Sequence, residues 1–257
     1  MNRYAQWVAF RAIIVKEVLR FTRIWIQTIL PPMITTALYF VIFGNLIGSQ
    51  IGDVHGFKYM EYIVPGLILM AVITNSYANV VASFYSAKFQ RNIEEMLVAP
   101  VPNALIMIGF IGGGVARGLA VGVAVTLVAL FFTPIPLHDL WVAISVLLLT
   151  SILFSLTGLI NAIYATSFDH ISIIPTFVLT PLTYLGGVFY TVAMLPPFWQ
   201  SVSLANPILY MVNAFRYGLL GVSDVNLAVA YAAILSFIMV LFWFALALLN
   251  RGYGVRT

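Results

Sequence analysis

Residues 140–166 read LWVAISVLLLTSILFSLTGLINAIYAT, a run of 27 residues without one charged side chain. The hydrocarbon core of a bilayer is about 30 Å thick, and an α-helix needs roughly 20 apolar residues to cross it. Five other runs are comparably apolar. The six predicted spans are therefore 26–47, 60–82, 104–132, 140–166, 171–192 and 228–249.

The composition of the whole chain indicates the same class of protein. Of the 257 residues, 62% are hydrophobic and 8% are charged, whereas soluble domains carry about 25% charged residues. A soluble fold of this size would leave too much apolar surface in water. We predict an all-α, polytopic membrane protein with six transmembrane helices, built as a single domain over residues 1–257.

The segment that precedes the first span, residues 1–25, combines an apolar stripe with basic side chains. The stripe is formed at helical spacing by Trp7, Phe10, Ile14, Val18 and Phe21, and the basic residues around it are Arg3, Lys16, Arg20 and Arg23. This pattern is typical of an amphipathic helix that lies at the membrane interface. The alternative is a short cytosolic tail.

The distribution of lysine and arginine predicts the orientation. Nine of the 12 basic residues fall in the N-terminal segment, in the loop after the second span and in the C-terminal tail. Six spans put these three segments on one side of the membrane. The positive-inside rule then predicts that both termini are cytoplasmic.

The loop between the second and third spans, residues 84–103, is the most polar part of the chain. Its residues 88–102 read KFQRNIEEMLVAPVP. We predict a short helix over 86–97, because the residue before Pro100 disfavours helix. One face would carry Ile93, Met96 and Leu97, and another Lys88, Arg91 and Glu95. The loop is either a solvated connection or a helix that docks into a groove on a cytosolic partner.

Polar side chains inside the predicted spans include Arg117, Asn75, Asn79 and Asn161. Arg117 lies about 20 Å along the third span, where a charge costs at least about 2.5 kcal/mol. It contacts either an anionic group of a substrate, or carbonyl groups or Glu61. Asn75 and Asn79 share one helix face, which indicates interhelical hydrogen bonds or a lining of the pathway.

The sequence carries no recognisable enzymatic site. It has no phosphate-binding G-x-x-x-x-G-K-[ST] motif, no cysteine, and three scattered histidines without the spacing of metal ligands. We therefore expect no catalytic residue, no metal and no cofactor bound by this chain, and no nucleic-acid partner. The glycines Gly109, Gly112, Gly113 and Gly114 favour close helix packing instead.

Two stretches resemble ABC type-2 exporter permeases, a family of transmembrane subunits. QRNIEEMLVAPVP, residues 90–102, resembles the cytoplasmic coupling segment of the family. Residues 177–221 resemble its fifth span, a glycine break, a proline-rich turn and a final Asn-Pro…Arg element. In this chain these features are Gly186, Gly187, Asn206, Pro207 and Arg216.

The resemblance implies a permease that forms the translocation pathway as a homodimer in the bacterial inner membrane, among membrane lipids. Two copies of a separate ATPase subunit would bind ATP-Mg, and this chain would not be an enzyme. The residues implied in ATPase coupling are Lys88, Gln90, Arg91, Glu94, Glu95, Leu97 and Pro100. The stretch 193–227 would form short re-entrant helices on the extracytoplasmic side, and its three tyrosine and tryptophan residues suit an interface.

The main alternative is an ion-coupled secondary transporter, which would need acidic residues near the middle of the membrane and internal repeats. The acidic residues near the spans fall close to their ends instead: Glu61, Asp139, Asp169 and Asp224. A membrane-embedded hydrolase would need a catalytic constellation at one interface, and none stands out in the sequence.

Overall fold

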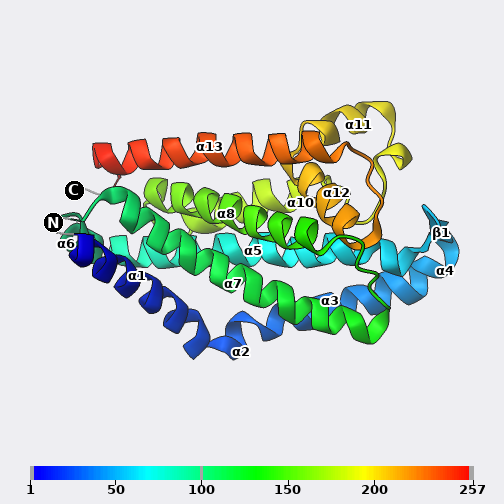
Figure 1. The fold of residues 1–257 in the computed structure, drawn as a ribbon, viewed down its shortest axis with the longest axis horizontal. Helices are drawn as coiled ribbons and strands as arrows, with labels where there is room; N and C mark the ends of the chain where they lie inside the picture. The colour runs from blue at the N-terminus through cyan, green and yellow to red at the C-terminus, as the bar shows by residue number, and fades with distance from the viewer. Residues whose placement is uncertain (1–2, 99–100, 255–257) are drawn as a thin grey trace.

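The computed structural model describes residues 3–98 and 101–254, and nearly all of them are helical (Figure 1). Four long helices run through the bundle: α5 (Tyr59–Phe89), α7 (Asn103–Phe132), α8 (Leu140–Tyr164) and α13 (Leu227–Arg251). A fifth long stretch, Trp25–Gly44, joins α2 (Trp25–Thr28), α3 (Leu30–Tyr39) and the start of the π-helix η1 (Phe40–Ile47). In the described ranges, these five stretches are long and apolar enough to cross a membrane.

The predicted class, an all-α polytopic membrane protein, is confirmed. The five stretches match five of the six predicted runs, although α5 continues to Phe89, well beyond residue 82. A short hairpin is the exception to an all-helical chain. It pairs β1 (Asp53–Val54) with β2 (Phe57–Lys58) after α4 (Gly48–Ile51). His55 and Gly56 both have positive φ, as two-residue hairpin turns require.

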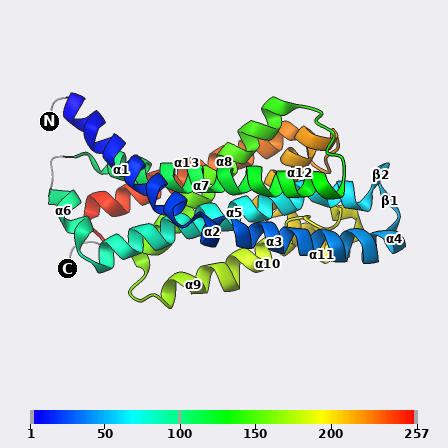
Figure 2. The same cartoon turned by 90° about the horizontal axis from the view of Figure 1, so that it is seen from below.

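The predicted run 171–192 differs from the structure at its C-terminal end. Its helical part consists of α9 (His170–Ile174), η2 (Pro175–Leu179) and α10 (Thr180–Tyr184). These elements lie along one edge of the bundle (Figure 2). The helix ends at Tyr184 because the chain turns at Gly187, whose φ of 71° is left-handed. At 1.5 Å per residue the helical part covers roughly 22 Å, which is less than the bilayer core.

The helix α5 forms the centre of the bundle. It packs against α7, α8 and α12 (Pro207–Leu220), and most of its side chains are buried. Its sequence is apolar on all sides rather than on one stripe, which is typical of a helix surrounded by others. Polar groups on α5 are therefore placed against protein, and this determines the contacts of Asn75 and Asn79.

The predicted close packing at the glycines of α7 is confirmed. A Cβ on Gly113 would lie 2.4 Å from Glu17 Cβ, and a Cβ on Gly109 would lie 2.6 Å from Ile13 Cγ2. Both contacts belong to α1 (Arg3–Arg23), which crosses α7. The small residues let the two backbones approach closely. The glycines of α7 thus determine which residues of α1 face α7.

The face of α1 that packs on the bundle overlaps the predicted apolar stripe only in part, at Phe21 and the partly buried Ile14. Its buried residues are Ile13, Glu17 and Phe21, of which only Phe21 belongs to that stripe. Trp7, the first residue of the stripe, is 58% exposed. The exposed aromatic and basic side chains of α1 remain available for a membrane surface, and its interfacial position stays a prediction.

The two ends of the bundle carry different elements. At one end, here called the α6 end, lie the beginning of α1, the end of α13 and α6 (Asn92–Val98) (Figure 1). At the other, here called the hairpin end, lie β1, β2 and α11 (Pro197–Leu204), which follows the short 3₁₀ helix η3 (Val192–Met194).

Candidate functional site

The predicted coupling helix over 86–97 is wrong in detail, because the chain turns within it. The helix α5 ends at Phe89, and α6 begins at Asn92. Between them Arg91 adopts a left-handed φ of 62°, a conformation that costs a non-glycine residue about 1 kcal/mol or more. The backbone N–H of Arg91 donates to Lys88 O at 3.0 Å, which closes the turn.

The turn and α6 present a polar surface at the α6 end. Gln90, Arg91 and Glu95 are exposed, and Glu94 is partly buried. Ile93, only 1% exposed, attaches α6 to the core. Leu97 lies in α6, and Pro100 is outside the described residues.

Lys88 does not share the exposed face with Arg91 and Glu95. Its Nζ donates to Ile163 O at 2.8 Å and to Ala165 O at 2.7 Å. Ile163 lies in the last turn of α8, and Ala165 is its C-cap. Carbonyls at a helix C-terminus have no partner within their own helix, and a cation there is favourable. Lys88 thus joins the end of α5 to the end of α8.

An aromatic cluster reinforces the same joint. Phe168, in the connection after α8, lies 4.8 Å from Tyr85 and 5.3 Å from Phe89 between ring centroids. Both partners belong to the last turns of α5. The connection between α8 and α9 is therefore fixed to α5 on the side where α6 begins.

We expect Lys88→Met to lower the free energy of unfolding by about 2 kcal/mol, because it removes two charged hydrogen bonds from partly exposed carbonyls. Unfolding in mixed micelles, titrated with dodecyl sulfate, measures the change. Lys88→Arg keeps a cation at the α8 terminus and serves as the matched control. Equal midpoints for Lys88→Met and the unchanged protein would contradict this role.

Arg117 pairs with an amide and not with Glu61, so the prediction of a Glu61 partner is wrong. Its Nη2 donates to Asn75 Oδ1 at 2.9 Å, and Asn75 Nδ2 donates to Ala71 O at 2.9 Å. Glu61 lies in the first turn of α5, 14 residues or about 21 Å from Asn75 along the helix.

Asn79, one turn along α5 from Asn75, binds a second guanidinium. Arg20 Nη2 donates to Asn79 Oδ1 at 2.8 Å and to Asn79 O at 2.9 Å. The predicted interhelical hydrogen bonds of the two asparagines are thus confirmed, with partners on α7 and α1. Both arginines lie against the same face of α5.

Glu17 belongs to the same network and was missed in the sequence. It is fully buried, accepts a hydrogen bond from Ser83 Oγ at 2.7 Å, and lies 3.4 Å from Arg20 Nη2. Ile13, Glu17 and Phe21 are spaced four residues apart, so they share one helix face. That spacing is a signal that could have placed Glu17 toward the bundle.

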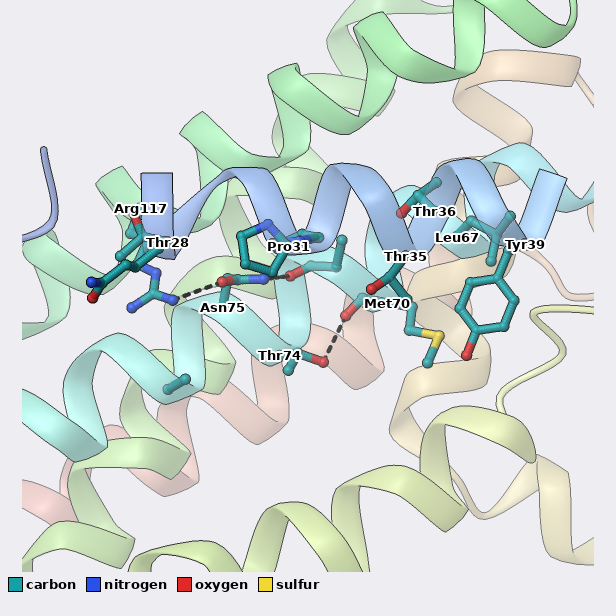
Figure 3. Close-up of a pocket in the computed structure, with 14 residues that line it drawn as sticks. Thr28, Pro31, Thr35, Thr36, Tyr39, Leu67, Met70, Thr74, Asn75 and Arg117 are labelled. Atoms are coloured by element: carbon teal, nitrogen blue, oxygen red, sulfur yellow. Dashed lines mark hydrogen bonds between the residues drawn. The ribbon is translucent and has the colours of Figure 1, made fainter. Parts of the chain in front are cut away.

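A cavity of about 370 Å³ begins at Arg117 and Asn75 and runs along α3 (Figure 3). Its other lining residues come from the Gln27–Tyr39 stretch and from α5, and they mix hydroxyl-bearing and apolar side chains. They are Gln27, Thr28, Pro31, Pro32, Thr35, Thr36, Tyr39, Leu67, Met70, Ala71, Thr74 and Ala78. A second cavity of about 290 Å³, between α5 and the α9–α10 stretch, shares Met70, Thr74 and Ala78 with the first.

The residues of the glycine and Asn-Pro…Arg elements come together at the turn after α10. Arg216 Nη2 donates to Gly187 O at 2.6 Å, and its guanidinium lies 4.0 Å above the ring of Tyr62. Asn206 Oδ1 accepts from Ile208 N, which caps α12 before Pro207, and Asn206 Nδ2 donates to Leu182 O. A Cβ on Gly186 would lie 2.7 Å from Ile208 Cγ2. The two elements thus form one packed joint.

Among the described residues, none of these three areas has the geometry of a metal centre. In residues 3–98 and 101–254, no three His, Asp or Glu side chains lie close enough together to hold a metal ion. The arrangement provides an exposed polar surface at the α6 end, a cavity with a cationic end, and a packed joint toward the hairpin end.

Comparison with known proteins adds the family context. The profile of the family described as ABC-2 type transporter matches residues 8–220. The Escherichia coli K12 protein named inner membrane transport permease YadH is 59% identical over 252 residues, which cover 98% of each chain. Nodulation protein J of Rhizobium meliloti is 24% identical over 92% of this chain and 90% of its own. Nodulation protein J of Sinorhizobium fredii is 25% identical over 84% and 82%, respectively.

Proposed function

The chain belongs to the ABC-2 type transporter family, and from this premise we propose that it is the permease subunit of an ATP-driven exporter. Two copies form the translocation pathway, and each binds one separate cytosolic ATPase subunit, which holds ATP-Mg. This chain carries no catalytic step of its own. Its place is the bacterial inner membrane, which agrees with the name of its 59% identical relative.

The observation that carries the proposal is the position of the coupling segment. The exposed side chains of Gln90 and Arg91 lie in the turn after α5, and that of Glu95 lies on α6. This segment is attached to two long helices. α6 continues from α5 through one turn, and Lys88 joins that turn to the end of α8. A push on α6 by a partner would therefore move both helices. Because Asn75 lies on α5 and lines the cavity, the movement would reach the cavity as well.

The proposed topology has six crossings with the α6 end in the cytoplasm. The α9–α10 stretch counts as the fifth crossing, and the turn at Gly187 together with α11 and α12 completes it from the extracytoplasmic side as re-entrant helices. Nine of the 12 basic residues then belong to cytoplasmic segments, as the positive-inside rule requires.

The decisive experiment is co-purification of the tagged chain from detergent-solubilised membranes of its host. We expect an ATPase subunit to accompany it. Glu95→Lys should reduce the amount recovered about tenfold, since reversing one charge at a protein interface costs at least about 1.4 kcal/mol. Asp53→Lys makes the same change of charge at an exposed site on the hairpin end and should leave recovery unchanged.

Arg91→Gly separates the side chain of Arg91 from its backbone. Glycine adopts a positive φ without a steric penalty, so the turn before α6 is kept while the guanidinium is lost. A reduced recovery then assigns a direct contact to Arg91. If no ATPase accompanies the unchanged chain, and transport continues without one, the proposal is wrong and an ion-coupled transporter is favoured.

A further inference from the structure

Arg117 is a cation without an acidic partner at the middle of two long helices. It is the fifteenth of the 30 residues of α7, and Asn75 is the seventeenth of the 31 residues of α5. Among the described residues, no carboxylate oxygen lies within 4.0 Å of its guanidinium, and Asn75 is its single hydrogen-bond acceptor. Its Nε is buried and has no partner in the described part of the chain.

The neighbouring charges increase the excess of positive charge. Arg20 binds Asn79, one turn of α5 from Asn75, and Glu17 faces Arg20 and Lys16. The one carboxylate of this network is thus used by other cations. A neutral amide oxygen cannot offset a charge held away from bulk water, so an anion beside Arg117 would be favourable.

The wall of the cavity next to Arg117 includes two residues whose backbone carbonyls lack their usual helical donors. Pro31 and Pro32 lack the N–H groups that would otherwise bond to the carbonyls of Gln27 and Thr28, four residues earlier. These four residues line the cavity. Backbone groups left open at membrane depth are tolerated where they face protein or a water-filled space, and not where they face lipid tails. The cavity is therefore a place for water or a polar ligand group.

The character of the lining changes along the cavity. Arg117 and Asn75 lie at one end, and Leu67, Met70 and Tyr39 lie toward the other (Figure 3). A volume of about 370 Å³ lies within the range of about 300–1,000 Å³ typical of small-molecule sites. Thr35 and Thr36 also lie at that second end (Figure 3), so its lining mixes hydroxyl-bearing and apolar side chains. The cavity thus offers a cationic end for a head group and a mixed, uncharged end for the chain attached to it.

We propose that this cavity binds an amphiphile with a negatively charged head group, and that Arg117 is the partner of that charge. Asn75 is a positioning residue, because its Nδ2 is held by Ala71 O and its Oδ1 is therefore turned toward Arg117. The inference rests on the proposed function, of which it names the substrate class. The head group is recognised by its charge, and its apolar chain distinguishes it from a free anion.

The test measures binding to the purified full-length chain in nanodiscs of neutral phosphatidylcholine. Lysophosphatidic acid, which has an anionic head and one chain, is the main probe. Lysophosphatidylcholine has a chain but no net charge, and inorganic phosphate has the charge but no chain. We expect lysophosphatidic acid to bind roughly tenfold or more tightly than either. Equal binding of lysophosphatidylcholine, or of inorganic phosphate, would overturn the proposal.

Two variants assign the binding to this cavity. Arg117→Gln should weaken the binding of lysophosphatidic acid about tenfold or more, whereas Arg11→Gln removes an exposed arginine of α1 and should not change it. Asn75→Asp puts a carboxylate beside Arg117, so it should abolish the preference for the anionic probe without lowering the melting temperature. A preserved preference in Asn75→Asp overturns the proposal even if Arg117→Gln does not fold.

The result of this binding test can be distinguished from the result of the co-purification that tests the proposed function. The binding assay contains no ATPase, so a failure here leaves the co-purification result untouched. Conversely, a chain that binds the anionic amphiphile but never an ATPase would keep this site and lose the exporter assignment.

Discussion

Glu17→Ala is expected to lower the free energy of unfolding by about 3 kcal/mol and to loosen α1 from the bundle. Removing one partner of a buried ion pair costs about 3–5 kcal/mol, because the other charge loses its compensation. Glu17 is fully buried, while 32% of the Arg20 side chain is exposed, so the lower end of this range applies. The hydrogen bond from Ser83 Oγ is lost as well.

Two measurements check this expectation. Unfolding titrated with dodecyl sulfate gives the free energy, and limited digestion with trypsin reports on α1, which carries cleavage sites at Arg20 and Arg23. Glu17→Gln keeps the length of the side chain and an oxygen for Ser83, so it should lose less than Glu17→Ala. Glu95→Gln removes an exposed carboxylate and serves as a control. Digestion of Glu17→Ala at the rate of the unchanged protein would contradict a role in holding α1.

The burial of Glu17 shows where prediction from the sequence stops. Five spans could be predicted because an apolar run of sufficient length is a local property, and their starts agree with the structure within one residue. The face that α1 buries depends on Gly113 of α7, which is about 100 residues away in sequence. The apolar stripe was predicted to face the membrane and does not identify the buried face of α1. The spacing of Ile13, Glu17 and Phe21 could indicate that face, but nothing near Glu17 in the sequence indicates its partner.

The turns differ from the predicted helices for a related reason. The residues around Arg91 are typical of a helix, and only the left-handed backbone of Arg91 separates α5 from α6. The break at Gly186 and Gly187, where the fifth run ends after Tyr184, was indicated by the family resemblance. The apolar run by itself predicted an end at residue 192, because the residues up to 192 remain apolar. Apolar composition sets which residues avoid water and does not set where a helix stops.

The candidate sites were predicted in part. The spacing of Asn75 and Asn79 was sufficient to predict interhelical hydrogen bonds, but their partners Arg117 and Arg20 follow from the packing of three helices. Lys88 was grouped with the exposed coupling residues, and the structure places it on the carbonyls of α8. That contact joins residues about 75 positions apart, which no local pattern could indicate.

Arg216→Leu is expected to have an effect comparable to that of Glu17→Ala, at the other end of the bundle. Arg216 is 1% exposed, and its guanidinium donates to Gly187 O and stacks on Tyr62. A charged hydrogen bond contributes about 1.5–3 kcal/mol, and a desolvated cation–π contact contributes about 2 kcal/mol. Leucine offsets part of this loss by avoiding the burial of a charge, so we expect a net loss of about 3 kcal/mol.

The same dodecyl sulfate titration measures this loss, and two variants show its origin. Arg216→Lys keeps the charge but not the planar group that stacks and donates, so it should lose almost as much as Arg216→Leu. Asn206→Ala removes only the cap of α12 and should cost about 1 kcal/mol. If lysine restored full stability, charge alone would hold the joint. If leucine had no effect, α12 would be held by its apolar contacts, and the turn at Gly187 would not depend on Arg216.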